Sequence, residues 1–195
     1  MADDMTGVVV LAGGRGARMG GDKPFHAWGA TTLIEAVLTR LEPQAADIAV
    51  NAGALDAPHA TRLAGLGLPV LYDDLPWRGP LSGVLSALQW ARLGGDTYVI
   101  TCPCDMPNLP DDYVARLTNA PDAAVAHYGG ADSYPLCARW RADLAEALET
   151  ALRAAPGGLG VMRFASAFTP LIVPVSDPAA FANINQINPA QRPDA

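Results

Sequence analysis

The sequence predicts one α/β domain with a mostly parallel β-sheet and helices on both faces. Short β-branched runs alternate with helix-forming segments, which is typical of parallel strands joined by crossover helices. The first run is apolar throughout, as expected for a strand covered on both faces. The length of 195 residues suits a single domain, and the chain contains no repeat and no internal linker.

Four strands are expected in the first half of the chain. The run GVVVL at Gly7–Leu11 stops at glycines and is typical of a buried strand. Similar runs at 47–51, 69–72 and 97–101 predict three more strands. Together they would form the centre of the sheet.

Three helices are expected to connect these strands. Thr32 and Glu35 fit a capping box at the start of an apolar helical face that Pro43 ends. A weaker helical pattern covers 57–64. A longer one covers 81–93 and ends at two glycines, the usual C-terminal signal of a helix.

The pattern is looser after residue 111. A short helix is expected over 112–117, followed by two strands at 123–128 and 134–140 on either side of a Gly-Gly pair. An amphipathic helix is expected over 141–154. These elements would extend the same sheet.

Composition and charge argue against several classes of function. The net charge of −7 argues against coating nucleic acid or a membrane surface. No apolar run approaches the roughly 18 residues that span a bilayer, and the first residues carry acid where a signal peptide carries base. Three cysteines cannot all pair, and Cys102 and Cys104 are too close to clamp a loop. We therefore expect a soluble cytoplasmic protein with reduced thiols.

Polar or glycine-rich residues stand at the ends of the first four strands. A glycine-rich loop follows the first strand, and Asn51, Asp73 and Asp105 stand at the ends of the other three. Ligands of open α/β sheets bind outside the carboxyl ends of the strands. The sequence therefore predicts a ligand site at this edge of the sheet.

The first loop combines glycines with positive charge. It reads LAGGRGARMGGDK from residue 11 to 23, and Arg15, Arg18 and Lys23 bring three positive charges together in an acidic protein. Glycines let backbone N–H groups approach an anion closely, so the loop suits a polyphosphate. A solvated surface loop is the alternative. The spacing fits neither a P-loop nor a dinucleotide fingerprint, so NAD is disfavoured.

Asp105 ends the segment CPCD after the fourth strand. A carboxylate beside a polyphosphate loop suits Mg²⁺, which bridges phosphates. The alternative is a turn or capping aspartate before Pro107. No further Cys or His has zinc-ligand spacing, so Cys102 and Cys104 are interpreted as small apolar residues that close a strand. The histidines share no spacing with a Ser or Cys nucleophile.

Two other segments offer candidate ligand contacts. Trp77 and Arg78 precede the run GPLSG at 79–83 and could contact a ligand ring, although a single exposed Trp more often packs at a rim. Asn183 and Asn185 alternate along an extended stretch and so face the same side. Turn capping is the alternative for both asparagines.

These motifs resemble the signature of the molybdenum cofactor guanylyltransferases (the MobA type). The matching segments follow the family order over nearly the whole chain: LAGG at 11–14, RMG at 18–20, DK at 22–23, GPLSG at 79–83, CPCDMP at 102–107 and NIN at 183–185. The resemblance implies a single Rossmann-like nucleotidyltransferase domain (GT-A-like fold) over 1–195. Its nucleotide-binding half would cover about 6–105 and its acceptor (pterin) half about 106–190.

The resemblance also implies an activity and partners. The family transfers GMP from GTP to the terminal phosphate of molybdopterin, releases pyrophosphate and uses Mg²⁺. GTP and molybdopterin would be the substrates, and molybdoenzyme apo-proteins or their chaperones would be further partners. No nucleic acid and no membrane are implied.

Site residues follow from the same resemblance together with the loop charges. Expected nucleotide contacts are Leu11, Ala12, Gly13, Gly14, Arg15, Lys23, Asn51, Asp73 and Asp105. Lys23, Arg18 and Asp105 are the expected catalytic residues, with Asp105 also the Mg²⁺ ligand. Asn183 and Asn185 are expected on the acceptor side.

The chemistry agrees with this set of residues. A phosphate nucleophile is already ionised at neutral pH, so no Ser, Cys or general base is needed. Catalysis then consists of aligning two anions and neutralising charge on the leaving pyrophosphate. Guanine presents two adjacent N–H donors, and a carboxylate such as Asp73 could accept both.

Three alternatives remain open at this point. A molybdenum cofactor cytidylyltransferase typically carries Ala where this chain has Gly13, and the smaller residue leaves more room for a purine. A sugar-phosphate nucleotidyltransferase would turn over without a pterin. A non-catalytic protein that binds GTP and delivers pterin would show no turnover.

Overall fold

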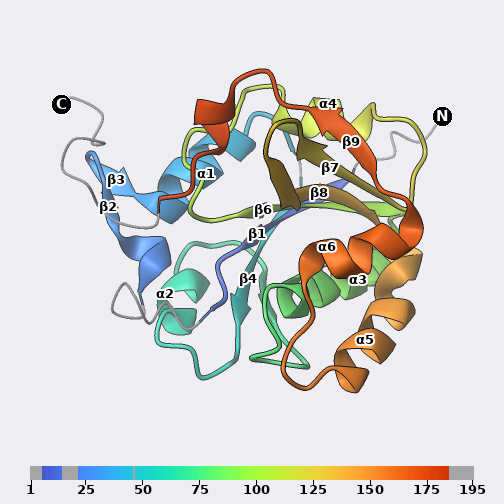
Figure 1. Ribbon diagram of the computed structural model, residues 1–195. Helices are drawn as coiled ribbons and strands as arrows, with labels where there is room; N and C mark the ends of the chain where they lie inside the picture. Colours follow the sequence, from blue (N-terminus) through green and yellow to red (C-terminus); the bar gives the residue numbers. More distant parts are fainter. Residues whose placement is uncertain (1–5, 15–21, 46, 185–195) are drawn as a thin grey trace.

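The computed structural model describes residues 6–14, 22–45 and 47–184, and its central feature is a twisted seven-stranded sheet (Figure 1). The strands of this sheet are β1 (Gly7–Leu11), β4 (Ile48–Gly53), β5 (Val70–Tyr72), β6 (Tyr98–Pro103), β7 (Val125–Gly129), β8 (Ser133–Arg141) and β9 (Leu171–Pro174). Their order is β5-β4-β1-β6-β8-β7-β9, with β1 near the centre. Only β8 of these seven runs antiparallel to its neighbours, so the sheet is mostly parallel as predicted.

Helices cover both faces of the sheet (Figure 1). They are α1 (Leu33–Leu41), α2 (Ala60–Ala64), α3 (Leu81–Gly94), α4 (Tyr113–Thr118), α5 (Ala145–Ala154) and α6 (Val161–Ala165). The core clusters place α1, α2 and α4 on one face and α3, α5 and α6 on the other. Short 3₁₀ turns occupy Lys23–Phe25, Ala142–Leu144, Ser166–Phe168 and Pro178–Phe181.

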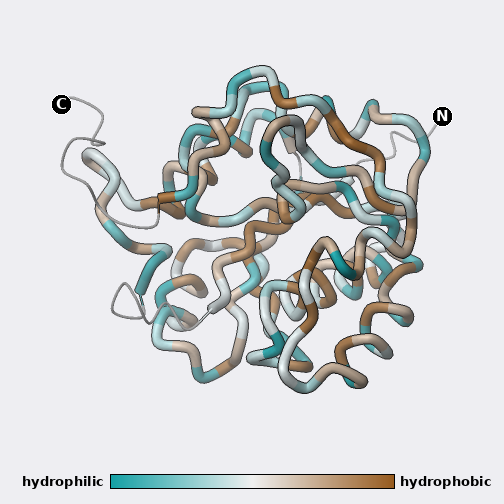
Figure 2. The backbone as a smooth tube through the Cα atoms, in the orientation of Figure 1, coloured by the Kyte–Doolittle hydropathy of each residue, from teal (hydrophilic) through white to brown (hydrophobic). Residues whose placement is uncertain are grey.

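The central strand β1 explains why both faces need helices. Side chains alternate between the two faces of a strand. Val8 and Val10 pack in the cluster with α1, α2 and α4, whereas Val9 packs in the cluster with α3, α5 and α6. All three valines are fully buried. Figure 2 shows the same hydrophobic character along the central strands, with hydrophilic segments mainly in the outer loops.

Most predicted boundaries are confirmed to within a few residues. The Thr32–Glu35 capping box begins α1, and Gly95 ends α3 in a left-handed conformation with φ = +83°. Strand β4 continues to Gly53, so Asn51 lies inside a strand rather than after it. None of the described helices is long and apolar enough to cross a membrane.

One predicted element was wrong at its start, and several were missed. The helix predicted over 141–154 begins only at Ala145, because Arg141 still pairs with Tyr98 at the end of β8 and a 3₁₀ turn follows. The sequence did not predict α6, β9 or a small hairpin of β2 (Ala27–Trp28) and β3 (Thr31–Thr32). The hairpin strands have two residues each, too few to show a period.

Candidate active site

A cavity of about 410 Å³ opens at the carboxyl ends of β1, β4, β5 and β6. This is the edge at which the sequence predicted a ligand site. The predicted residues that line the cavity are Leu11, Gly13, Gly14, Lys23, Asn51, Asp73 and Asp105. Ala12 is buried behind them, and its amide donates to the Asn51 carbonyl at 2.9 Å.

Three glycines let the ends of β1 and β4 and the start of α3 approach one another closely. A Cβ on Gly13 would lie 2.7 Å from the Cα of Gly53 and 2.8 Å from its amide nitrogen. A Cβ on Gly83 would lie 2.6 Å from Oδ1 of Asn51. Gly53 has φ = +76°, a left-handed conformation that favours glycine. The side chain of Asn51 is thus enclosed by backbone, and it is 1% exposed.

Asn51 and α3 hold the carboxylate of Asp73 in one orientation. Nδ2 of Asn51 donates to Oδ1 of Asp73 at 2.8 Å, and the hydroxyl of Ser86 donates to the same oxygen at 3.0 Å. In the described part of the chain, Oδ2 of Asp73 has no hydrogen-bond partner, so it can accept from a ligand in the cavity. Burial raises the pKa of Asp73, the two hydrogen bonds oppose this rise, and the charge of Asp74 adds to it.

Lys23 and Asp105 form an ion pair in the same cavity. The Lys23 ammonium contacts Oδ2 of Asp105, and their side chains are 22% and 13% exposed. Lys23 begins a 3₁₀ turn anchored by the buried Pro24, and Asp105 follows β6 by two residues. A phosphate bound here would pair with the Lys23 ammonium. The Asp105 carboxylate would then need a different cation as its partner.

The remaining oxygen of Asp105 suits a metal ion. Oδ1 is buried and has no hydrogen-bond partner among the described residues. Mg²⁺ needs only one or two carboxylates, because waters and substrate phosphates complete its shell. Among residues 6–14, 22–45 and 47–184, no three His, Cys, Asp or Glu side chains surround a common point. A metal at Asp105 would therefore be held mainly by substrate oxygens and water.

A backbone hydrogen bond joins the end of the described chain to Asp105. The amide of Ile184 donates to the Asp105 carbonyl at 3.0 Å. Asn183, the residue before Ile184, is exposed and is not among the residues that line the cavity. Arg15, Arg18 and Asn185 lie outside the described residues.

The three cysteines are buried and form no disulfide, and the burial of Cys102 and Cys104 agrees with their interpretation as small apolar residues. Cys102 and Cys104 belong to the core cluster under α1 and α4, and Cys137 joins them from β8. Burial raises the pKa of Cys104 to about 12. The thiols therefore stay protonated at neutral pH.

Ser86, Gly53 and the role of Gly83 in the site were not predicted from the sequence. Ser82 and Ser86 are both buried and lie four residues apart on α3. Two hydroxyls on one buried helical face were a usable signal, because buried hydroxyls need partners. The close approach of Gly13 and Gly53 had no such signal, since the two residues are distant in sequence.

Comparison with known proteins gives a consistent result. A family model described as the MobA-like NTP transferase domain matches residues 8–168. A protein of Cereibacter sphaeroides named molybdenum cofactor guanylyltransferase is 42% identical over 180 residues, covering 91% of this chain and 89% of that protein. One of the same name from Pasteurella multocida is 38% identical over 187 residues, covering 92% and 94%.

Solved structures agree on the fold. Molybdopterin-guanine dinucleotide biosynthesis protein A from Archaeoglobus fulgidus superposes with a TM-score of 0.76 at 22% identity, covering 93% of each chain. A 2-C-methyl-D-erythritol 4-phosphate cytidylyltransferase from Thermus thermophilus gives 0.66 at 18% identity, covering 94% of each. The predicted Rossmann-like nucleotidyltransferase fold is confirmed. With the family model matched over most of its length, this chain belongs to the MobA-like NTP transferase family.

Proposed function

We propose that this MobA-like nucleotidyltransferase transfers GMP from GTP to the terminal phosphate of molybdopterin and releases pyrophosphate. The observation that carries the proposal is one cavity with two different ends. The Asn51–Asp73 pair lies at β4 and the end of β5, and the Lys23–Asp105 ion pair lies beyond β6, on the other side of β1 in the strand order. The names of the relatives, at 38–42% identity over most of the chain, support this reaction over its alternatives.

The first end suits a guanine base. Oδ2 of Asp73 can accept from both N–H donors on one edge of guanine, while Asn51 and Ser86 hold Oδ1. Cytosine presents one amino donor on the corresponding edge and would leave this carboxylate less satisfied. A site built to accept two hydrogen bonds discriminates against a ligand that supplies one. Leu11, Ala12, Gly13 and Gly14 would contact the nucleotide through their backbone.

The second end suits the phosphates. An oxygen of the acceptor phosphate attacks the α-phosphorus of GTP, and the bond from that phosphorus to the β-phosphate oxygen breaks. Lys23 would bind the triphosphate and offset its charge, assisted by Arg15 and Arg18. Asp105 would hold Mg²⁺, which when bound neutralises charge on the leaving pyrophosphate.

The acceptor would enter from the side of the C-terminal segment. Asn183 and Asn185, on either side of the Ile184 amide that donates to Asp105, are the proposed acceptor contacts. In this division residues 6–105 supply the nucleotide half and residues 106–190 the acceptor half of one domain. Molybdoenzyme apo-proteins or their chaperones would receive the product, and we place the reaction in the cytoplasm.

Pyrophosphate release by the purified chain tests the proposal. With Mg²⁺ and molybdopterin, release is expected with GTP, far less with CTP, and none without the pterin. Asp105→Ala should abolish it, whereas Asp111→Ala, which removes an exposed carboxylate paired with Arg40, should not. Release with CTP alone would indicate a cytidylyltransferase, and release without pterin a sugar-phosphate enzyme. GTP binding without turnover would indicate a delivery protein.

A further inference from the structure

Trp77 stands out at the rim of the cavity. It lines the cavity, its side chain is 43% exposed, and its φ of +67° lies in the left-handed region. In the described part of the chain, Thr169 is the one other non-glycine residue with positive φ. A bulky residue adopts this conformation only when the surrounding structure imposes it, and such residues concentrate at functional sites.

The loop that carries Trp77 is fixed from two helices. The Arg78 guanidinium donates to the carbonyl of Leu152 near the end of α5 at 2.8 Å. The hydroxyl of Ser82 on α3 donates to the Leu75 carbonyl at 2.7 Å. These bonds hold the residues on both sides of Trp77. The backbone of Trp77 is thus fixed by the fold rather than left free to relax.

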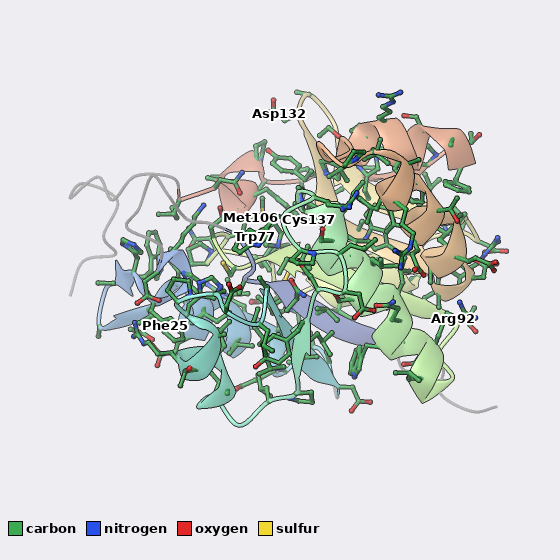
Figure 3. All side chains as sticks on the ribbon, turned by 90° about the horizontal axis from the view of Figure 1, so that it is seen from below. Phe25, Trp77, Arg92, Met106, Asp132 and Cys137 are labelled. Atoms are coloured by element: carbon green, nitrogen blue, oxygen red, sulfur yellow. The ribbon has the colours of Figure 1, made fainter. Side chains whose placement is uncertain are left out.

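Gly158 adds a steric contact to this arrangement. A Cβ on Gly158 would lie 3.1 Å from the Arg78 carbonyl oxygen, and Gly158 has φ = +96°. The segment after α5 therefore packs directly against the backbone next to Trp77. In the view of Figure 3 the label of Trp77 stands near the centre of the picture, close to those of Met106 and Cys137.

We propose that Trp77 stacks on the base of the bound nucleoside triphosphate. Trp77 is the one aromatic residue among the described residues that line the cavity. It follows Asp73 by four residues on the same loop, so the loop that would bind the edge of the base also offers a surface for its face. Stacking on an indole contributes affinity for every base, because every base has a π-face.

This inference rests on the proposed function. It assigns two different roles in base binding to two residues. Trp77 supplies affinity that is insensitive to the base, and Asp73 supplies the choice of guanine. A substitution at Trp77 should therefore weaken the binding of GTP and of CTP to the same extent. If Trp77 only held the loop in place, its substitution would also displace Asp73 and change the preference for GTP over CTP.

Tryptophan fluorescence during titration with GTP, without the acceptor, tests the proposal directly. The chain has four tryptophans. GTP is expected to quench the fluorescence of the wild-type protein, and the Trp77→Phe variant should lose this quenching. Trp90→Phe is the matched control, because Trp90 packs over Gly7 at the opposite end of β1 and should leave the response intact. Inorganic triphosphate, which has no base, should cause no quenching.

Steady-state kinetics provide a second measurement. Trp77→Leu should raise the KM for GTP about tenfold or more with little change in kcat, and Trp77→Phe should fall between Leu and wild type. The ratio of kcat/KM for GTP to kcat/KM for CTP should remain that of the wild-type protein. If Trp77→Leu does not fold, the fluorescence of Trp77→Phe still decides.

The outcomes separate this inference from the proposed reaction. Quenching through Trp77 without pyrophosphate release would support base stacking and overturn the proposed reaction. Wild-type KM in Trp77→Leu, with normal pyrophosphate release, would overturn base stacking alone. Quenching by inorganic triphosphate, or only after the pterin is added, would also overturn it.

Discussion

Gly13→Ala tests the close approach of two strand ends described above. The new Cβ would lie 2.7 Å from the Cα of Gly53 and 3.0 Å from Oδ1 of Asn51. Ordinary contact begins at 3.4 Å, so the backbones would have to separate by about 0.7 Å. Gly53 presents backbone, which cannot rotate away. Overpacking of this kind costs about 1–3 kcal/mol.

Thermal unfolding measures this cost. For a chain of this length, 1 kcal/mol lowers Tm by about 2–4 °C, so Gly13→Ala should unfold about 2–12 °C below wild type. Gly130→Ala is the control, because a Cβ there meets nothing within 4 Å. Its Tm should stay close to that of wild type.

GTP binding by the same variant separates two explanations of Gly13. If the strand ends separate, Asn51 and then Asp73 move, and affinity for every nucleotide should fall. If Gly13 only leaves room for a purine, the variant should keep its stability and change its base preference. An unchanged Tm, equal to that of Gly130→Ala, would refute the steric reasoning.

Three further predictions concern Asp73, Cys104 and Arg139. Burial raises the pKa of Asp73 above 3.8, so ionisation of Asp73 destabilises the folded protein as pH rises through the raised pKa. Asp73→Asn should therefore resist urea better than wild type at pH 7. This gain in stability should shrink near pH 4, where the wild-type carboxyl is protonated in the folded protein. A gain that is constant with pH would contradict this. Cys104, with a thiol pKa of about 12, should escape an aromatic disulfide reagent at pH 8 until the protein is unfolded, and rapid labelling of folded protein would contradict its burial. Arg139→Met removes the donors to two carbonyls at the end of α4 and two in the segment after it, and it should cost about 3 kcal/mol or more in chemical unfolding. The exposed control Arg141→Met should cost much less, and equal losses would contradict this role of Arg139.

The sequence was most informative where a signal is local. The valines of β1, the capping box of α1 and the glycines after α3 each depend on residues a few positions apart. Their positions were predicted closely for that reason. The same holds for the edge of the sheet that carries the cavity, because the carboxyl ends of parallel strands meet at one edge.

Features that depend on distant residues could not be predicted in this way. Strand β9 is a short edge strand whose placement comes from pairing with β7, and Ile172 is exposed on it, so its hydrophobic pattern is weak. The start of α5 was misplaced because the pairing of Arg141 with Tyr98 extends β8. In the site, Ser86 and Gly53 reach Asp73 and Gly13 only through tertiary packing.

The hydrogen bond between Ile184 and Asp105 has a consequence for synthesis on the ribosome. Strand β6 is translated well before β8 pairs with it, and the carbonyl of Asp105 receives its partner only from the last described residue. At about 5–20 residues per second, the interval between Asp105 and Ile184 lasts several seconds. During that time a nascent chain contains Asp105 but not the segment that donates to its carbonyl. The backbone contact beside the cavity therefore forms only after residue 184 has been synthesised.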